Sequence, residues 1–208
     1  MIAAVIVGIT RLLSGVRPRW VGCAPTARQR IYFSNHTSHL DFAVLWASLP
    51  PRLRARTRPV AARDYWEPNA LRRYLAAHVF RAVLVDRHGD AGDRAARVER
   101  ARCTIERTAA ALGAEDSLIV FPEGTRGNGV EIAPFKSGMY HLARLRPDVE
   151  LVPAYLENLN RIMPKGEVLP VPLLASVTFG TPVKVEPAEA CDAFLARAHA
   201  ALLALRRA

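Results

Sequence analysis

The sequence is poor in the residues that mark several common classes of protein. Its 208 residues include three cysteines, widely spaced and without a C-x-x-C pair, so neither a disulfide framework nor a zinc module is indicated. This cysteine usage predicts a reducing, cytoplasmic location. No internal repeat or low-complexity linker is present, and 50% hydrophobic with 23% charged residues is typical of a globular protein. Disordered, collagen-like and coiled-coil chains are therefore excluded.

Lysine is also scarce, although the chain is strongly basic. Only three of the 29 basic residues are lysines, and the net charge is +10. Residues 1–107 hold 19 arginines against 8 acidic residues, whereas residues 108–208 are almost neutral. A basic face of this kind fits the phosphates of a nucleic acid, an anionic membrane or a phosphorylated substrate. An Ala- and Arg-rich chain is also what a G+C-rich coding sequence yields.

The chain begins with an apolar run, which Arg11 interrupts after ten residues. A membrane span needs about 20 apolar residues, and a signal peptide would begin with a charged region. The apolar residues instead repeat at the spacing of one helical face: Ile2, Val5, Ile6, Ile9, Leu12, Leu13 and Val16. We predict a short amphipathic helix over 1–16, which either docks on the domain formed by 17–208 or lies on a membrane surface.

Strand and helix patterns alternate along the rest of the chain. Strands are predicted at 30–33, 59–62, 82–85, 117–121, 151–155, 175–179 and 183–185, and helices at 40–49, 65–79, 93–112, 137–145 and 187–206. This alternation predicts an α/β domain in which helices flank a mainly parallel or mixed central sheet.

Polar residues follow three of these predicted strands. They are Asn35-His36, Asp86-Arg87 and the segment 123–126, each just past a strand's carboxyl end. Ligands of such sheets bind beyond the carboxyl ends of the strands. The three segments therefore predict a single site.

The first of these segments pairs a histidine with a carboxylate. His36 and Asp41 would lie about 140° apart on an ideal helix, so they meet only if His36 is in the loop and Asp41 in the first helical turn. A carboxylate on one ring nitrogen leaves the other nitrogen as a general base. The spacing alone is a weak signal, because His88 and Asp93 repeat it in a predicted turn. A metal site that also uses His39 is a further alternative, although no fourth ligand is evident.

The third segment, residues 121–126, is a turn with chemistry suited to an anion. Gly124 lets backbone N–H groups approach closely, while Thr125 and Arg126 add a hydroxyl donor and a planar guanidinium. Glu123 would orient Arg126 or receive a substrate hydroxyl. A surface turn with a solvated ion pair is the alternative.

Together these segments resemble the conserved blocks of the glycerolipid acyltransferases, most closely the 1-acylglycerol-3-phosphate (lysophosphatidate) acyltransferases. His-x4-Asp at 36–41 is followed by Val-Leu-Val-Asp-Arg at 83–87, Phe-Pro-Glu-Gly-Thr-Arg at 121–126 and Leu-Val-Pro-Ala at 151–154, in the family's order. Pro-Phe-Lys-Ser-Gly at 134–138 resembles the usual continuation of the third block.

The resemblance implies transfer of a fatty acyl group from acyl-CoA or acyl-carrier protein to the hydroxyl of lysophosphatidate, giving phosphatidate. His36 would remove the hydroxyl proton, and Asp41 would support His36. No metal or organic cofactor is implied. The resemblance assigns the binding of the acceptor to Arg87, Glu123, Gly124, Thr125 and Arg126.

Two alternatives keep part of this interpretation: the same chemistry on another lysolipid, or a non-catalytic basic protein that binds membranes. The alternating arginines of 52–58 would form one basic face in a strand, but no nucleic-acid motif accompanies them. We therefore expect no nucleic-acid partner. The expected partners are the acyl donor, the lysolipid acceptor and an anionic membrane, with the protein peripheral on the inner face of the cell membrane.

Overall fold

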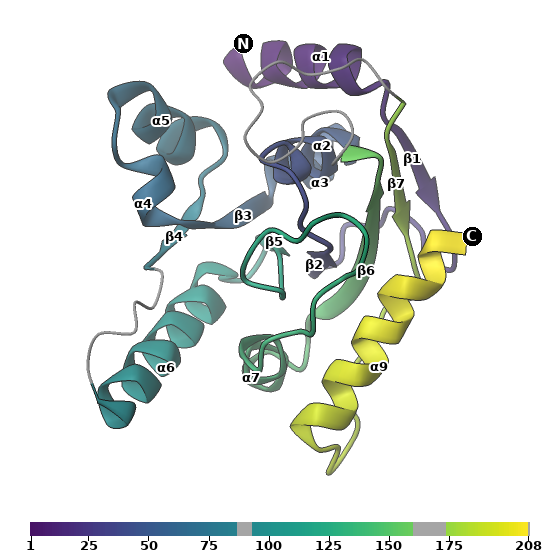
Figure 1. Ribbon diagram of the computed structural model, residues 1–208. Helices are drawn as coiled ribbons and strands as arrows, with labels where there is room; N and C mark the ends of the chain where they lie inside the picture. The colour runs from purple at the N-terminus through teal and green to yellow at the C-terminus, as the bar shows by residue number, and fades with distance from the viewer. Residues whose placement is uncertain (87–92, 160–173, 208) are drawn as a thin grey trace.

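A computed structural model describes residues 1–86, 93–159 and 174–207 of the chain. Its centre is a seven-stranded sheet with the order β1-β7-β6-β2-β5-β3-β4 (Figure 1). All neighbouring strands run parallel except β6 and β7, which are antiparallel. The predicted α/β architecture with a mainly parallel sheet and flanking helices is therefore confirmed. The strands are β1 (Arg17–Trp20), β2 (Arg30–Ser34), β3 (Thr57–Ala62), β4 (Val83–Val85), β5 (Ser117–Val120), β6 (Glu150–Glu157) and β7 (Ser176–Phe179).

Helices cover both faces of this sheet. The α-helices are α1 (Ile2–Ser14), α2 (Asp41–Ser48), α3 (Pro51–Ala55), α4 (Arg63–Trp66), α5 (Ala70–Tyr74), α6 (Arg94–Ala111), α7 (Gly138–Leu145) and α9 (Cys191–Ala204). A π-helical turn, Leu75–Val79, extends α5, and a 3₁₀ turn, Leu205–Arg207, ends the chain. Figure 1 shows α1 to α5 toward one side of the sheet and α6, α7 and α9 toward the other.

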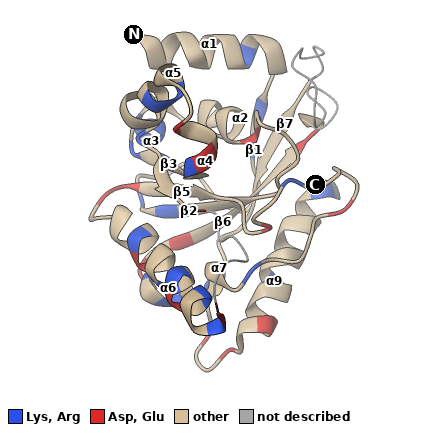
Figure 2. Ribbon diagram, turned by 60° about the vertical axis from the view of Figure 1, so that its left-hand side comes forward, with Lys and Arg blue, Asp and Glu red and all other residues tan. Residues whose placement is uncertain are grey.

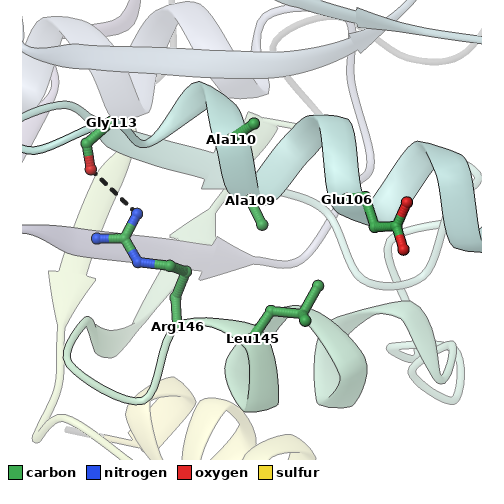
Figure 3. Close-up of a pocket in the computed structure, with 6 residues that line it drawn as sticks. All are labelled: Glu106, Ala109, Ala110, Gly113, Leu145 and Arg146. Atoms are coloured by element: carbon green, nitrogen blue, oxygen red, sulfur yellow. Dashed lines mark hydrogen bonds between the residues drawn. The ribbon is translucent and has the colours of Figure 1, made fainter.

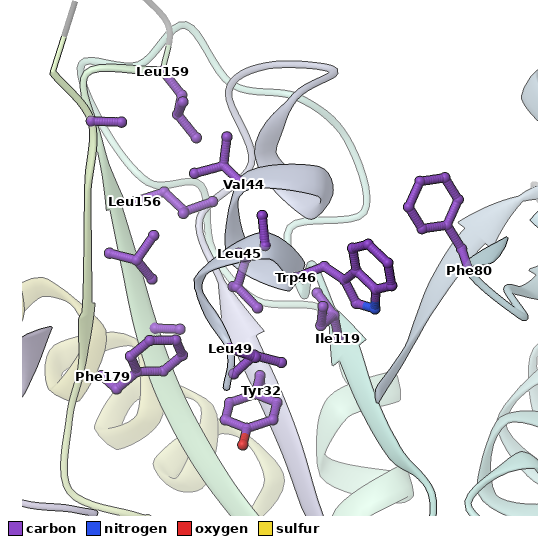
Figure 4. Packing of buried hydrophobic residues seen from close by; sticks show 14 of the residues in the cluster. Tyr32, Val44, Leu45, Trp46, Leu49, Phe80, Ile119, Leu156, Leu159 and Phe179 are labelled. Carbon is purple, nitrogen blue, oxygen red and sulfur yellow. The ribbon is translucent and has the colours of Figure 1, made fainter. Parts of the chain in front are cut away.

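The buried sheet explains why its strands read as continuous apolar runs. Successive side chains of a strand point to opposite faces, so Tyr32 packs under α2 while Ile31 and Phe33 pack against the opposite layer. Figure 4 shows the α2 side of this core, in which Leu45 and Leu49 lie near Tyr32 and Trp46 faces Phe80. Helix α2 is buried along nearly its whole length because the sheet lies on one side of it and α1 on the other.

Helix α1 docks on α2 and leaves much of its apolar surface outside. The Arg11 Nε and Nη2 atoms donate to the carbonyl oxygen of Ala47 near the end of α2, at 3.2 and 2.9 Å. Val7 is buried in this contact, but Val5 and Leu12 are 59% and 83% exposed. The apolar stripe that the sequence predicts as one face therefore points largely away from the domain.

Several predicted elements differ from the structure. The helix predicted over 65–79 is three pieces, because Pro68 interrupts it and Asn69 caps a new start by accepting a hydrogen bond from the Arg72 N–H. Val183 pairs with Leu151 in an isolated bridge, so 183–185 is not a strand, and the last helix begins at 191 instead of 187. The alternating arginines of 52–58 do not share one strand, since α3 occupies the first part of this segment. Strand β1 was not predicted.

Several of the arginines form ion pairs with neighbouring segments. Figure 2 shows Lys and Arg positions along α6 and near α3 and α5, with acidic residues among them. Arg58 and Arg81 share Asp116, while Arg28 and Arg30 share Glu150. These pairs bind loops and strand ends to one another, so most of these arginines have structural partners.

Candidate active site

The order of the strands brings two of the three polar segments together. Strand β2 lies beside β5 and runs parallel to it, with Phe33 opposite Val120. The chain after β2, with His36, and the chain after β5, with 121–126, therefore leave the sheet side by side. The remaining segment, which begins with Asp86, follows β4, and β3 separates β4 from β5.

His36 and Asp41 form the centre of the first segment. Asp41 opens α2 and is fully buried, and its Oδ2 atom lies 2.8 Å from His36 Nδ1. The same oxygen accepts hydrogen bonds from the backbone N–H groups of Thr37 and Ser38. With Asp41 ionised, Nδ1 carries the proton, and Nε2 has a lone pair free to accept one. The two side chains meet as the sequence predicts, and their catalytic role stays a prediction.

Glu123 connects the two loops through their backbones. Its Oε1 accepts a hydrogen bond from the His36 N–H at 2.7 Å, and its Oε2 accepts one from the Ala133 N–H at 2.9 Å. The carboxyl group is almost completely buried. Burial raises its pKa, although these hydrogen bonds and the His36 ring act in the opposite direction. The predicted contact of Glu123 with substrate stays untested, but the residue has a clear structural role here.

Two further contacts hold His36 against the loop that follows β5. The His36 ring stacks on Phe121, with centroids 4.3 Å apart and planes 22° from parallel. The Gly127 N–H donates to the His36 carbonyl oxygen at 2.8 Å. His36 is thus held at its N–H, its carbonyl, its ring face and its Nδ1 atom, which preorganises the ring for proton transfer.

Gly124, Thr125 and Arg126 form the exposed side of the same loop. Gly124 has φ +70°, a conformation that favours glycine, and Thr125 is exposed. Arg126 is partly exposed, and in the described chain no hydrogen bond or ion pair occupies its guanidinium. Arg126 lies close enough to His39 to lower the pKa of that imidazole, after the larger effect of burial.

His39 lies outside the His36–Asp41 pair. Its ring stacks on the ring of Tyr65, with centroids 5.0 Å apart. The Arg72 guanidinium lies over the same Tyr65 ring, 4.6 Å from its centroid. Within the described ranges, no three His, Cys, Asp or Glu side chains are grouped closely enough to hold a metal ion.

Asn35 has a structural role that the sequence did not reveal. Its buried side-chain amide donates to the Leu156 carbonyl oxygen at 2.9 Å, and its Oδ1 accepts from the Leu156 N–H at 2.8 Å. The side chain thus continues the pairing of β2 with β6 by one step. Asp86, in contrast, pairs with Arg63 on the surface, and Arg87 and His88 lie outside the described residues.

Comparison with known proteins identifies the family. A family model described as Acyltransferase matches residues 22–157, which include β2, α2, β5 and β6. The chain belongs to the acyltransferase family.

The chain is similar in sequence to individual acyltransferases over most of its length. It is 34% identical over 173 residues to a 1-acyl-sn-glycerol-3-phosphate acyltransferase of Limnanthes alba, covering 81% of this chain and 56% of that protein. It is 31% identical over 145 residues to 1-acyl-sn-glycerol-3-phosphate acyltransferase alpha of Homo sapiens, covering 69% and 46%. The chain therefore spans about half the length of the curated relatives it matches.

A solved acyltransferase has the same fold. The crystal structure of the 1-acyl-sn-glycerophosphate acyltransferase PlsC from Thermotoga maritima matches 99% of this chain and 79% of its own, with a TM-score of 0.70 and 17% sequence identity. At this identity the likeness concerns the fold alone. In the part of this chain that the structure describes, no helix combines the length and hydropathy that a bilayer span requires.

A surface pocket lies away from the His36 loop. It has a volume of about 390 Å³ and is lined by Glu106, Ala109, Ala110, Gly113, Leu145 and Arg146 (Figure 3). These residues come from the ends of α6 and α7, and Arg146 donates to the Gly113 carbonyl oxygen. The pocket adjoins the start of β5, whereas the candidate site lies beyond its end. It therefore has no part in the site.

Proposed function

We propose that this acyltransferase moves a fatty acyl group from a thioester, acyl-CoA or acyl-carrier protein, to the free hydroxyl of lysophosphatidate, producing phosphatidate. The observation that carries the proposal is the 2.8 Å contact between His36 Nδ1 and the buried Asp41 carboxylate. The similarity to 1-acyl-sn-glycerol-3-phosphate acyltransferases supports this choice of acceptor.

In this proposal His36 is the general base. Its Nε2 takes the proton of the acceptor hydroxyl while that oxygen attacks the thioester carbonyl. The C–S bond then breaks, and the leaving thiolate takes the proton back from the imidazolium. Asp41 keeps Nδ1 protonated and stabilises the positive charge that His36 carries between these two steps. The acyl group passes directly to the acceptor, so no covalent acyl-enzyme is needed.

The loop after β5 supplies the binding groups for the acceptor phosphate. The Arg126 guanidinium forms two parallel hydrogen bonds with a phosphate more readily than any other side chain does, and Thr125 adds a hydroxyl. Gly124 gives this turn the positive φ that it needs. Arg87 is proposed as a further phosphate ligand on the resemblance of its sequence block alone, because it lies outside the described residues.

We further propose that the protein works peripherally at the inner face of the cell membrane. Two exposed apolar groups support this: Val5 and Leu12 on α1, and Leu71 and Tyr74 on α5. Both helices lie at the same end of the molecule in Figures 1 and 2. Arg72 and Arg73 on α5 add positive charge that suits anionic lipid.

Purified protein, a radiolabelled acyl thioester and lysophosphatidate test the reaction. We expect labelled phosphatidate from the wild type and a fall in kcat of roughly 1,000-fold or more in His36→Ala. His141→Ala, on an exposed position of α7, is the matched control and should retain wild-type activity. A His36→Ala variant with the wild-type rate would refute the assignment. Parallel assays with acyl-CoA, acyl-carrier protein and other lysolipids establish the donor and acceptor.

A further inference from the structure

Lys136 lies directly on the glycine of the proposed phosphate-binding loop. A Cβ atom built on Gly124 would stand 2.9, 2.8 and 2.7 Å from the Cδ, Cε and Nζ atoms of Lys136. The lysine side chain therefore occupies the space that the missing glycine side chain leaves. Lys136 comes from the 134–138 segment, to which the proposed mechanism assigns no role.

The backbone on both sides of this lysine is fixed. The Phe135 ring is buried and meets Phe33 of β2 edge-on, with centroids 6.0 Å apart. The Lys136 N–H donates to the Pro122 carbonyl oxygen at 2.9 Å, and the Lys136 carbonyl accepts from the Met139 N–H at 3.2 Å. The side chain thus leaves a rigid point of the fold, and this geometry directs it over Gly124.

The ammonium group is not neutralised by the loop that it touches. The nearby carboxylate of Glu123 is already bound by two backbone N–H groups. Among the described residues, neither Lys136 nor Arg126 has an ion pair, whereas Arg28, Arg30 and Arg58 do. Two cations without carboxylate partners are therefore anchored in one short loop and its continuation.

We propose that Lys136 is a second cationic ligand of the acceptor's phosphate and makes the site selective for a phosphomonoester. This inference rests on the proposed function. A phosphomonoester has a second pKa near 6 and carries close to two negative charges at pH 7, whereas the phosphodiester of most lysolipids carries one. Arg126 matches one pair of oxygens with its planar fork, and the compact ammonium of Lys136 compensates the additional charge.

The test compares Lys136→Met and Lys136→Arg with the wild type on two acceptors of equal chain length. These are lysophosphatidate, a monoester, and lysophosphatidylglycerol, a diester. Methionine keeps the stem over Gly124 and removes the charge, so it preserves packing. Lys184→Met, at an exposed lysine outside the site, is the matched control.

We expect Lys136→Met to raise the KM for lysophosphatidate roughly 10- to 100-fold, as loss of a hydrogen bond to a charged group does. Its kcat and its KM for the acyl donor should stay within about twofold, and the KM for the diester should change little. Lys136→Arg should retain most of the selectivity. In the wild type the preference for the monoester should fall as the pH drops through about 6, and Lys136→Met should lose this dependence.

Binding of a short-chain lysophosphatidate, measured by calorimetry, separates this inference from the proposed function. If the wild type binds the monoester more tightly than Lys136→Met but transfers no acyl group to it, the proposed reaction fails and the phosphate site stands. If the wild type is active and Lys136→Met has an unchanged KM for lysophosphatidate, the role of Lys136 is refuted. The same holds if Lys136→Met raises the KM for both acceptors equally.

Discussion

The carboxylate of Glu123 and the backbone N–H of His36 lie 2.7 Å apart, although 87 positions separate them in the sequence. Through this bond the loop after β5 sets the position of the histidine at the end of β2. The sequence suggests that Glu123 contacts a ligand, whereas in the structure its carboxylate binds backbone N–H groups of the protein. Changes at Glu123 should therefore act on catalysis through the placement of His36.

Glu123→Ala should impair both stability and turnover. It leaves the His36 and Ala133 N–H groups without their acceptor, at a cost of about 1–3 kcal/mol for each buried donor. We expect a lower free energy of unfolding in urea and a fall in kcat of roughly 100-fold, with substrate KM values little changed. Glu131→Ala, at an exposed carboxylate of the same loop, is the control. Equal effects of the two substitutions would contradict the role of Glu123.

Asp41→Asn should slow the reaction without unfolding the protein. The amide keeps the shape of the carboxylate but loses the charge that holds His36 in the Nδ1–H tautomer, and such losses lower kcat by about 10²- to 10⁴-fold. Steady-state kinetics measures this effect, and circular dichroism checks the fold. Asp192→Asn, at an exposed aspartate of α9, should have wild-type kinetics. An Asp41→Asn enzyme with full activity would exclude the pair as the proton-transfer unit.

The pH dependence of stability should report on His39. Burial, with Arg126 as the next cause, lowers the pKa of His39 below its ordinary value of 6.5. The unfolded chain then binds the proton first as the pH falls. The stabilising contribution is complete above about 6.5 and is lost as the pH drops from there toward the lowered value. Urea unfolding between pH 7.5 and 5 should give a shallower decline for His39→Gln than for the wild type, and an unchanged decline would contradict this assignment.

Arg126→Ala should raise the pKa of His39, because it removes a nearby positive charge. NMR titration of the His39 ring protons measures the change directly. Arg107→Ala, at an exposed arginine of α6, should leave this titration unaltered. A His39 pKa that does not respond to Arg126→Ala would show that the Arg126 guanidinium does not lie close to the His39 ring.

Membrane binding should depend on the outer face of α1. Val5 on α1 and Val98 on α6 are 59% and 61% exposed, so Val5→Glu and Val98→Glu are matched substitutions. We expect Val5→Glu to reduce co-sedimentation with phosphatidylglycerol vesicles roughly tenfold, since it places a charge in the apolar contact surface. Val98→Glu should bind like the wild type. Both should unfold within about 0.5 kcal/mol of it, and equal vesicle binding by the two variants would refute the role of α1.

The sequence by itself determined the elements whose signals are local. Alternating buried strands and helices predicted the α/β class, and the helix predicted over 93–112 matches α6, which Asp93 caps. The His-x4-Asp spacing and the 121–126 turn also predicted which residues meet at the carboxyl edge. Such features depend on side chains within one turn or one strand end, which the order of residues displays directly.

Tertiary structure alone decided which of these distant segments contact one another. Strand β1 pairs with β7, more than 150 positions later, and its four residues carry no apolar pattern of their own. The apolar stripe of α1 predicted a helix but not the side to which that stripe points. The contact of Arg11 with the Ala47 carbonyl oxygen sets this orientation. Glu123 and Asn35 bind backbone atoms of segments that strand order brings near them. Backbone atoms are the same in every residue, so no sequence pattern predicts such contacts.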